Sequence, residues 1–282
     1  PPKRYYMQKA AISVPGEGRT LEAYLALPEE RTGPHPAVIV IHEIFGPDRH
    51  IQDVARRFAR EGYIAIAPNL FTGEIQQLLT PEAIATGFGF LRGLPPEVQR
   101  DPKQTQARIA ALPTEKRAAL AALMKIQDPA QHAKFAQDLC AVARYLRGRS
   151  DVEPRKVASV GFCFGGAMSG RLACADPGLA AAVIFYGNAP PADQIPHIRC
   201  PMLGLYGAED HRITDTIPKF AEEAKEAGVR LTYHIYPGAP HAFFNDTRAE
   251  LYRAEAAADA WKRVQAFLRT EFGRYSSLTG NG

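Results

Sequence analysis

The sequence predicts an α/β fold, with a mostly parallel central sheet that is covered by helices on both faces. Strand-like and helix-like segments alternate along most of the chain, as they do in parallel sheets. The apolar run AVIVI at residues 37–41 is uninterrupted, as expected for a strand that is buried on both faces. The chain has 282 residues, so we expect one domain that spans residues 1–282.

The first part of the chain alternates short apolar segments with turn residues. Its two N-terminal segments are expected to pair as antiparallel strands, because the glycines between them, at 16–18, favour a tight turn. Further on, Gly62 is expected to end a helix and Pro68 to end a strand. The expected elements are strands at 8–14, 21–27, 37–41 and 63–67, and a helix at 50–61.

Residues 72–130 interrupt this alternation with weak helical patterns and repeated proline and glycine. Thr80 followed by Pro81 is typical of a helix start, with a capping side chain and proline in the first turn. Long insertions are often functional, so we expect a helical cap over the edge of the sheet that holds the site. The alternative is an excursion that packs away from the site. The short apolar stripe in this segment consists of Leu120, Leu123 and Met124.

The alternation resumes at Asp128 and Pro129, which again have the pattern of a capped helix start. Thr247 and Glu250 have the spacing of a capping box, so we expect the last helix to begin there and to run to about Phe272. The expected inward-facing residues are Phe135, Leu139, Val142 and Leu146 in the first of these helices, and Ile217, Phe220 and Ala224 in a helix at 214–227 that ends at Gly228. The other expected elements are strands at 156–160, 180–185, 202–206 and 230–236, and a helix at 164–174.

Composition disfavours several classes of protein. The net charge is +4 and the 34 basic residues are scattered, so no nucleic-acid partner is expected. No stretch approaches about 18 consecutive apolar residues, so no membrane span is expected. The four cysteines have neither CxxC nor zinc-ligand spacing, which favours reduced thiols in a cytoplasmic protein without a metal. Residues 1–9 lack the apolar core of a signal peptide, although a chain that does not begin with Met leaves a removed signal open.

The most informative motif is GFCFGG at residues 161–166, directly after the apolar run VASV. A strand, a nucleophile flanked by glycines and a helix form the nucleophile elbow of α/β-hydrolase folds, here with Cys163 where serine is usual. The glycines leave room for the sharp turn, and the N-terminus of the following helix favours a thiolate. The alternative is a buried cysteine in a helix-packing turn.

A nucleophile of this kind needs an acid and then a histidine later in the chain. Asp210 comes shortly after the strand at 202–206, and His241 lies in the loop after the strand at 230–236. The base takes or stabilises the proton of the nucleophile, and the acid fixes the tautomer of the base. The alternatives are Glu209 and Asp215 for the acid, and His211 and His234 for the base.

Two backbone N–H groups are expected to form an oxyanion hole. One belongs to Phe164, after the nucleophile, and the other to Ile44, in the segment HEIFG that follows AVIVI. Glu43 is the unusual residue here, because a carboxylate at the end of a buried strand is costly unless it has a partner. One interpretation is that Glu43 faces the thiol, and the other is that it points to solvent.

Taken together, four motifs resemble the dienelactone hydrolase family: HEIFG at 42–46, GFCFGG at 161–166, GAED at 207–210 and HAFFND at 241–246. The likeness covers about residues 8–70 and 130–270. The resemblance implies an α/β-hydrolase that opens a lactone or ester, with chemistry of the carboxymethylenebutenolidase type, through an acyl-thioester on Cys163. A small-molecule lactone or ester is therefore the expected partner. No phosphate-binding loop, dinucleotide fingerprint or metal-ligand cluster is present, so no cofactor is expected.

The resemblance also implies roles for individual residues. Glu43 would contact the resting thiol, and substrate binding would release the thiolate to His241. Ile44 and Phe164 would supply the two oxyanion N–H groups. A separate possibility is that Cys163 is a thiol sensitive to peroxide. No second cysteine is near it in the sequence, although Cys174 follows in the expected helix at 164–174.

The chain departs from the best-known members of that family at two positions. Those members bind the carboxylate of the substrate with two arginines, where this chain has Gly73 and Asn245. Neither residue replaces a bidentate guanidinium. We therefore expect a more general ester or lactone hydrolase, unless an arginine of the insertion, for example Arg92, substitutes. The alternatives are a carboxylesterase for neutral short-chain esters and a non-catalytic fold that binds a small ligand.

Overall fold

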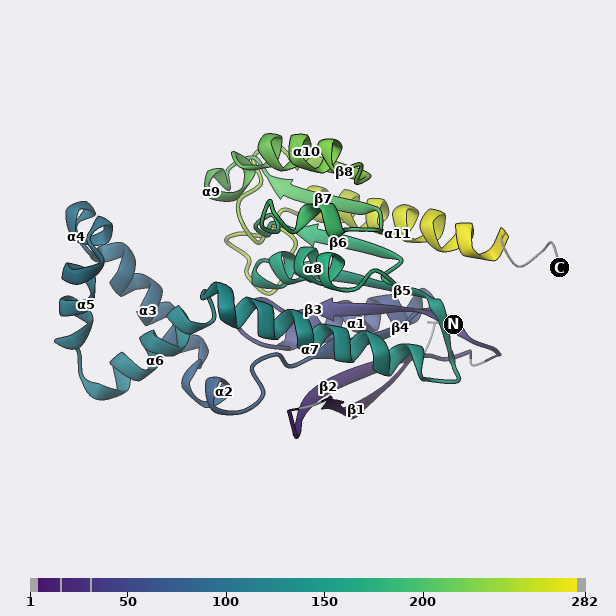
Figure 1. Ribbon diagram of the computed structural model, residues 1–282, viewed down its shortest axis with the longest axis horizontal. Helices are drawn as coiled ribbons and strands as arrows, with labels where there is room; N and C mark the ends of the chain where they lie inside the picture. Colours follow the sequence, from purple (N-terminus) through teal and green to yellow (C-terminus); the bar gives the residue numbers. More distant parts are fainter. Residues whose placement is uncertain (1–4, 16, 31, 278–282) are drawn as a thin grey trace.

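The computed structural model describes residues 5–15, 17–30 and 32–277, and its eight strands form one sheet (Figure 1). The strands are β1 (Tyr5–Val14), β2 (Arg19–Pro28), β3 (His35–Ile41), β4 (Ile64–Pro68), β5 (Val152–Phe162), β6 (Ala181–Phe185), β7 (Met202–Gly207) and β8 (Leu231–Tyr236). The helices are α1 (Arg49–Arg60), α2 (Glu74–Leu78), α3 (Pro81–Gly93), α4 (Pro96–Arg100), α5 (Pro102–Ala110), α6 (Thr114–Lys125), α7 (Pro129–Arg147), α8 (Phe164–Ala175), α9 (His211–Thr214), α10 (Ile217–Glu226), α11 (Ala254–Ser277) and the short 3-10 helix η1 (Ile195–His197).

The strands follow the order β1-β2-β4-β3-β5-β6-β7-β8 across the sheet. β2 pairs antiparallel with β1 and with β4, and all pairings from β4 to β8 are parallel. The predicted mostly parallel sheet is therefore confirmed. Because the parallel strands end at the same edge, the loops after β3, β5, β6, β7 and β8 lie along that edge.

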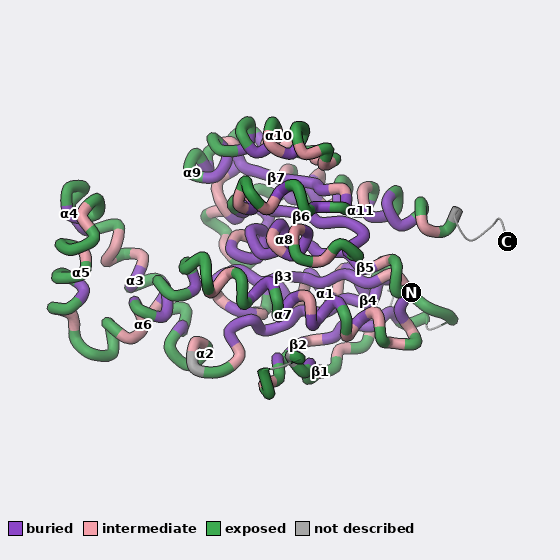
Figure 2. The backbone as a smooth tube through the Cα atoms, viewed as in Figure 1, coloured by how far each residue is buried: buried purple, intermediate pink, exposed green. Residues whose placement is uncertain are grey.

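The central strands are buried on both faces of the sheet (Figure 2). In β3, Ile39 and Ile41 belong to the core layer that also contains side chains of α7, α8 and α10. Val38 and Val40 belong to the opposite layer, with side chains of α1 and α11. Successive residues of a strand point to opposite faces, which explains why this segment is apolar throughout. The predicted helices on both faces are confirmed.

Helices α3 to α6 form an arm beyond the carboxyl edge of the sheet (Figure 1). In the chain, these helices lie between β4 and α7. As predicted, Pro81 begins α3 and the Thr80 hydroxyl accepts a hydrogen bond from the Ala83 N–H at 3.1 Å. Leu120 and Leu123 in α6 are buried, but Met124 is 43% exposed. The apolar stripe of Leu120, Leu123 and Met124 is therefore only partly buried.

Most other predicted elements are confirmed to within a few residues. Two boundaries were wrong: Pro68 is the last residue of β4, paired opposite Ala23, and α11 begins at Ala254 rather than near the predicted capping box. Thr247 lies in a turn, where its N–H and hydroxyl donate to the Asn245 side-chain oxygen at 3.0 and 2.6 Å. These bonds hold a loop instead of starting a helix. The predicted turn at 16–18 includes a residue outside the described ranges.

The inward-facing residues predicted for α7 and α10 are all buried. At the start of α7, the Asp128 carboxylate accepts a hydrogen bond from the Ala130 N–H at 2.7 Å, as predicted. The last helix, α11, extends to Ser277, beyond the predicted end. Within the described residues, no helix combines the length and the apolar character needed to cross a membrane.

Candidate active site

Cys163 lies at the sharp turn between β5 and α8. Its backbone has φ 56° and ψ −117°, an unusual conformation for a residue other than glycine, and its N–H donates to the Phe185 carbonyl at 3.0 Å. A Cβ atom on Gly161 would lie 1.8 Å from the Gly165 carbonyl oxygen, and one on Gly165 would lie 2.2 Å from the Ile41 carbonyl oxygen. The two glycines therefore permit the close packing that holds the thiol at the carboxyl edge.

The loops after β7 and β8 bring the acid and the histidine together. The Glu209 N–H donates to the Ala239 carbonyl at 3.0 Å, which joins the two loops. His241 Nδ1 then lies 2.5 Å from an oxygen of the buried Asp210 carboxylate. A carboxylate only accepts, so Nδ1 carries a proton and Nε2 is the atom free to exchange a proton with another group.

The electrostatics around His241 favour its protonated form. Burial lowers the pKa of the imidazole, but hydrogen bonds to Asp210 and Cys163, together with their negative charges, raise the pKa from 6.5 to about 10. The opposite charges of a thiolate and an imidazolium stabilise each other in this half-buried position. The arrangement can therefore hold an activated thiol beside a proton donor.

The alternative acids and bases lie elsewhere or have other partners. Asp215 pairs with His211 at 3.4 Å on an exposed surface, where their side chains are 68% and 72% exposed. The His234 ring packs against the Tyr236 ring, with centroids 4.4 Å apart. Glu209 lines the cleft beside Asp210. Within the described part of the chain, the carboxylate that pairs with His241 is that of Asp210, not that of Glu209.

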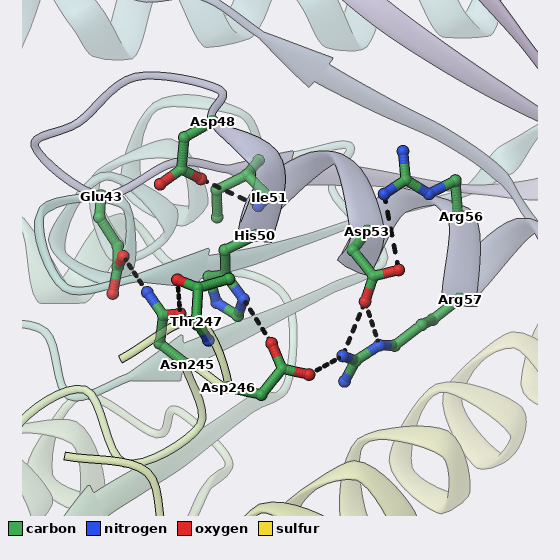
Figure 3. A network of polar contacts seen from close by, with 10 residues as sticks. All are labelled: Glu43, Asp48, His50, Ile51, Asp53, Arg56, Arg57, Asn245, Asp246 and Thr247. Atoms are coloured by element: carbon green, nitrogen blue, oxygen red, sulfur yellow. Dashed lines mark hydrogen bonds and ion pairs between the residues drawn. The ribbon is translucent and has the colours of Figure 1, made fainter. Parts of the chain in front are cut away.

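Glu43 is only 2% exposed, so it does not point to solvent. One of its carboxylate oxygens accepts a hydrogen bond from the Asn245 amide nitrogen at 3.0 Å (Figure 3). The Thr247 N–H donates to the amide oxygen of Asn245, which fixes the amide with its NH2 group toward Glu43. Burial and the nearby Asp48 charge raise the pKa of Glu43 to about 7.

A second group of charges holds this loop against α1. Asp246 accepts a hydrogen bond from Arg57 at 2.7 Å, and its other oxygen lies 4.0 Å from His50 Nδ1 (Figure 3). Burial lowers the pKa of His50 to about 4, so this ring is neutral near pH 7. The loop that carries His241 is thus tied to α1 at one end and to Glu43 through Asn245.

Ile44 and Phe164, the two residues expected to supply oxyanion N–H groups, both line the cleft that contains Cys163. Phe164 is the first residue of α8, so its N–H has no partner within the helix. Within the described residues, neither N–H donates to a backbone carbonyl. Both residues line the same cleft as Cys163, where these donors could stabilise a developing negative charge.

The cleft has a volume of about 790 Å³ and contains Cys163 and His241. One wall is formed by α3, which contributes Ile84, Phe88 and Arg92. The Arg92 Nε donates to the Phe88 carbonyl at 3.3 Å, one turn earlier in the helix. The cleft also contains two further arginines, Arg212 and Arg248.

Tyr186 is a candidate functional residue that the sequence analysis missed. It follows β6 with φ 37°, and its ring centroid lies 5.1 Å from that of His241. Its hydroxyl is buried without a hydrogen-bond partner among the described residues, although it lines the cleft. Burial raises the pKa of Tyr186 well above 10, so the hydroxyl remains a donor. The sequence signal that could have identified Tyr186 is its position directly after a predicted parallel strand, where side chains of the site edge are expected.

Asn245 and Gly73, the two positions at which the resemblance implied arginines, lie in other surroundings here. The Asn245 amide is occupied by Glu43 and Thr247, and Gly73 precedes α2 with φ 108°. Of the predicted substitutes, Arg92 does line the cleft. The described residues contain no group of three or more His, Cys, Asp or Glu side chains arranged to hold a metal ion.

The parallel sheet, the elbow and the loops at its carboxyl edge define an α/β-hydrolase. The model of the dienelactone hydrolase family matches residues 21–272, and the chain belongs to this family. It is therefore a hydrolase.

Curated relatives whose names include carboxymethylenebutenolidase are similar over nearly the whole chain. One from Saccharolobus solfataricus is 38% identical over 254 residues, which cover 90% of this chain and 95% of the relative. One from Synechocystis is 33% identical and covers 92% of this chain and 96% of the relative. One from Escherichia coli is 31% identical and covers 94% and 88%, respectively.

Solved structures share the fold. A Klebsiella pneumoniae protein named for dienelactone hydrolase has a TM-score of 0.68 and 30% identity, and the match covers 93% of this chain and 98% of that chain. A dienelactone hydrolase-like promiscuous phosphotriesterase from metagenomic libraries has a TM-score of 0.70 and 23% identity, with 94% and 98% covered. At that identity the second likeness concerns the fold alone.

Proposed function

We propose that the protein opens lactones or esters through an acyl-thioester on Cys163, with His241 as the base and acid and Asp210 as the residue that orients it. The observation that carries this proposal is that His241 Nδ1 lies 2.5 Å from the Asp210 carboxylate, while Cys163 acts together with Asp210 to raise the pKa of the same imidazole. Cys163 lies at the elbow of a fold whose family hydrolyses such bonds.

In the first half-reaction, the Cys163 thiolate attacks the carbonyl carbon of the substrate and forms a carbon–sulfur bond. The carbonyl oxygen becomes an oxyanion, which the N–H groups of Ile44 and Phe164 stabilise. Collapse of this intermediate breaks the carbon–oxygen bond of the ester. The leaving oxygen takes the proton held on Nε2 of His241. With a lactone, the leaving group stays attached to the acyl part.

In the second half-reaction, neutral His241 removes a proton from a water molecule. The resulting hydroxide attacks the thioester carbonyl, and the same two N–H groups receive the oxyanion. The carbon–sulfur bond then breaks, which releases the carboxylic acid and restores the thiolate beside the protonated imidazole. Asp210 keeps Nδ1 protonated in both halves, so that Nε2 always faces the reaction.

Glu43 is proposed as the carboxylate that controls the resting thiol. It lines the cleft with Cys163, and both lie close enough to Tyr186 for their charges to raise the pKa of its hydroxyl. Because burial raises the pKa of Glu43 to about 7, this carboxyl can gain or lose a proton near neutral pH. A group of this kind can hydrogen-bond to the thiol in one state and repel the thiolate in the other.

The substrate class follows from the walls of the cleft. Arg92, Arg212 and Arg248 line it, which favours a lactone or ester that carries a carboxylate. A neutral short-chain ester is the second candidate, because neither Asn245 nor Gly73 offers a free polar group to an anion. Since α3 supplies one wall, we also propose that residues 72–130 act as a cap over a single domain.

The test compares three substrates of the wild-type enzyme: a dienelactone with its carboxylate, its methyl ester, and a short p-nitrophenyl ester. The same panel is measured with Cys163→Ala and Arg92→Gln. Loss of all turnover in Cys163→Ala supports the thioester route, whereas retained turnover refutes it. A preference for the anionic lactone that Arg92→Gln weakens supports the carboxylate-binding cleft. A preference for the neutral esters, independent of Arg92, establishes the second candidate.

A further inference from the structure

His42 is a fully buried histidine that directly follows β3 and is not part of the Cys163–His241–Asp210 series. Its Nδ1 lies 2.5 Å from the Glu43 carbonyl oxygen. Its Nε2 lies 3.1 Å from the backbone nitrogen of Leu70. Both ring nitrogens therefore have backbone partners, one in the oxyanion segment and one in the loop that leads to α2.

These two partners determine the protonation state of the ring. A backbone N–H can only donate, so the Leu70 N–H requires a lone pair on Nε2. A carbonyl oxygen can only accept, so Nδ1 carries the proton and donates to Glu43. The ring must then be the neutral Nδ1–H tautomer. Burial also lowers the pKa of His42 to about 4, which agrees with this assignment.

The accepting carbonyl belongs to the same peptide group as the Ile44 N–H. The peptide is planar and trans, as are all peptide bonds of the described residues, so its C=O and N–H point in opposite directions. A hydrogen bond that fixes the Glu43 carbonyl therefore also fixes the direction of the Ile44 N–H. The Gly46 N–H donates to the same oxygen at 3.3 Å, which closes the turn.

The imidazole also packs against the second proposed oxyanion residue. It stacks on the Phe164 ring with centroids 6.0 Å apart, and it meets the edge of the Phe71 ring at 4.7 Å. One rigid side chain thus contacts both segments that supply oxyanion donors. It also links them to the loop that enters the cap segment.

We propose that His42 is a positioning residue that aims the Ile44 N–H at the oxyanion by holding the peptide between Glu43 and Ile44. This inference rests on the proposed function, because it assigns a role within the same site. It predicts that the hydrogen bond from Nδ1–H to Glu43 helps to stabilise the transition state. The hydrogen bond from Leu70 to Nε2, by contrast, stabilises the folded protein.

Two substitutions separate the two bonds. His42→Asn places an amide nitrogen near the position of Nδ1, where it can donate to the Glu43 carbonyl, but it cannot reach Leu70. His42→Gln places an amide oxygen near the position of Nε2, where it can accept from Leu70, but it leaves no donor at the Nδ1 position. The two variants therefore each lose one bond and are otherwise similar in size and polarity.

The expected result is a difference in kcat. Removal of one oxyanion donor typically lowers kcat by about 100- to 1,000-fold, so a misdirected donor in His42→Gln should lower it by about 10- to 100-fold with KM changed less than about threefold. His42→Asn should keep kcat within about fivefold of the wild type. An equal loss in both variants, compared at temperatures where each is folded by circular dichroism, would overturn the proposal.

Alkylation of Cys163 by iodoacetamide is the control for the thiol. This reaction forms a carbon–sulfur bond and expels iodide without creating an oxyanion, so His42→Gln should react at the wild-type rate. A parallel loss of alkylation would place the effect on the thiol and refute the inference. A wild-type enzyme without Cys163-dependent ester turnover would instead refute the proposed function.

A measurement on the wild-type protein tests the same inference without a substitution. Nitrogen-15 NMR of the ring should show protonated Nδ1 and unprotonated Nε2 from about pH 5.5 to 9, and an aldehyde that adds to Cys163 should shift the Nδ1–H resonance. The Nε2–H tautomer, or a resonance that the adduct leaves unchanged, would overturn the assignment.

Discussion

Replacement of Asp210 by asparagine tests the electrostatic coupling at the centre of the site. The carboxylate lies 2.5 Å from His241 Nδ1, and its charge and hydrogen bond help to raise the pKa of the imidazole. Asparagine has nearly the same shape but no charge. We therefore expect Asp210→Asn to lower the pKa of His241 and to weaken its pairing with the Cys163 thiolate.

The magnitude follows from the size of the pKa change. Burial lowers the pKa of His241, yet Asp210 and Cys163 raise it from 6.5 to about 10, which at about 1.4 kcal/mol per pKa unit corresponds to roughly 5 kcal/mol. Asp210 and Cys163 each supply a hydrogen bond and a charge, so the loss of the Asp210 charge removes only part of this free energy. The His241 side chain is 30% exposed, and solvent screening reduces the share of Asp210 to about 1–2 kcal/mol. The pKa of His241 should fall by about one unit, and because its pairing with the thiolate is weakened by about 1–2 kcal/mol, kcat/KM at pH 7 should fall about tenfold.

The assay combines NMR titration of the His241 ring with kcat/KM for a p-nitrophenyl ester between pH 6 and 10. The folded-state pKa lies above the unfolded one, so protonated His241 stabilises the fold fully below pH 6.5, and this stabilisation is lost as the pH rises through about 10. The variant should lose less stability over that range. Asp215→Asn is the matched control, because Asp215 pairs with the exposed His211. An unchanged pKa of His241 in Asp210→Asn would refute the reasoning.

Two further predictions concern stability. Burial raises the pKa of Glu43 to about 7, so the folded state retains a proton that the unfolded chain releases above pH 4.5, and stability falls between these values. Glu43→Gln should therefore raise Tm relative to the wild type at pH 8 but not at pH 4, and an equal change at both pH values would contradict this. Gly161→Ala should abolish cooperative thermal unfolding, because its Cβ would lie 1.8 Å from the Gly165 carbonyl oxygen. Gly148→Ala, whose nearest contact would be 3.5 Å, is the control that should fold, and a normally folded Gly161→Ala would disprove the steric argument.

Local patterns were sufficient for most of the fold. The apolar run at 37–41 predicted a strand buried on both faces, and Thr80 with Pro81 predicted the start of α3. The predicted capping box at Thr247 was wrong, because the Thr247 hydroxyl and N–H both donate to the side-chain oxygen of Asn245. A spacing pattern cannot show whether the Thr247 hydroxyl accepts from a helix N–H or donates to a side chain of its own loop, since that depends on the path of the loop. A cytoplasmic location stays a prediction.

The sequence by itself determined the class of the fold, the elbow at Cys163 and the order in which Asp210 and His241 follow it. These features depend on residues that are neighbours in the chain or on the regular alternation of strands and helices. Only the tertiary structure decided that Glu43 is buried against Asn245 and that Tyr186 lines the cleft. Glu43 and Asn245 are 202 positions apart. Such contacts form where loops from different strands converge at one edge of the sheet, and the side chains that meet there depend on packing, which no local pattern records.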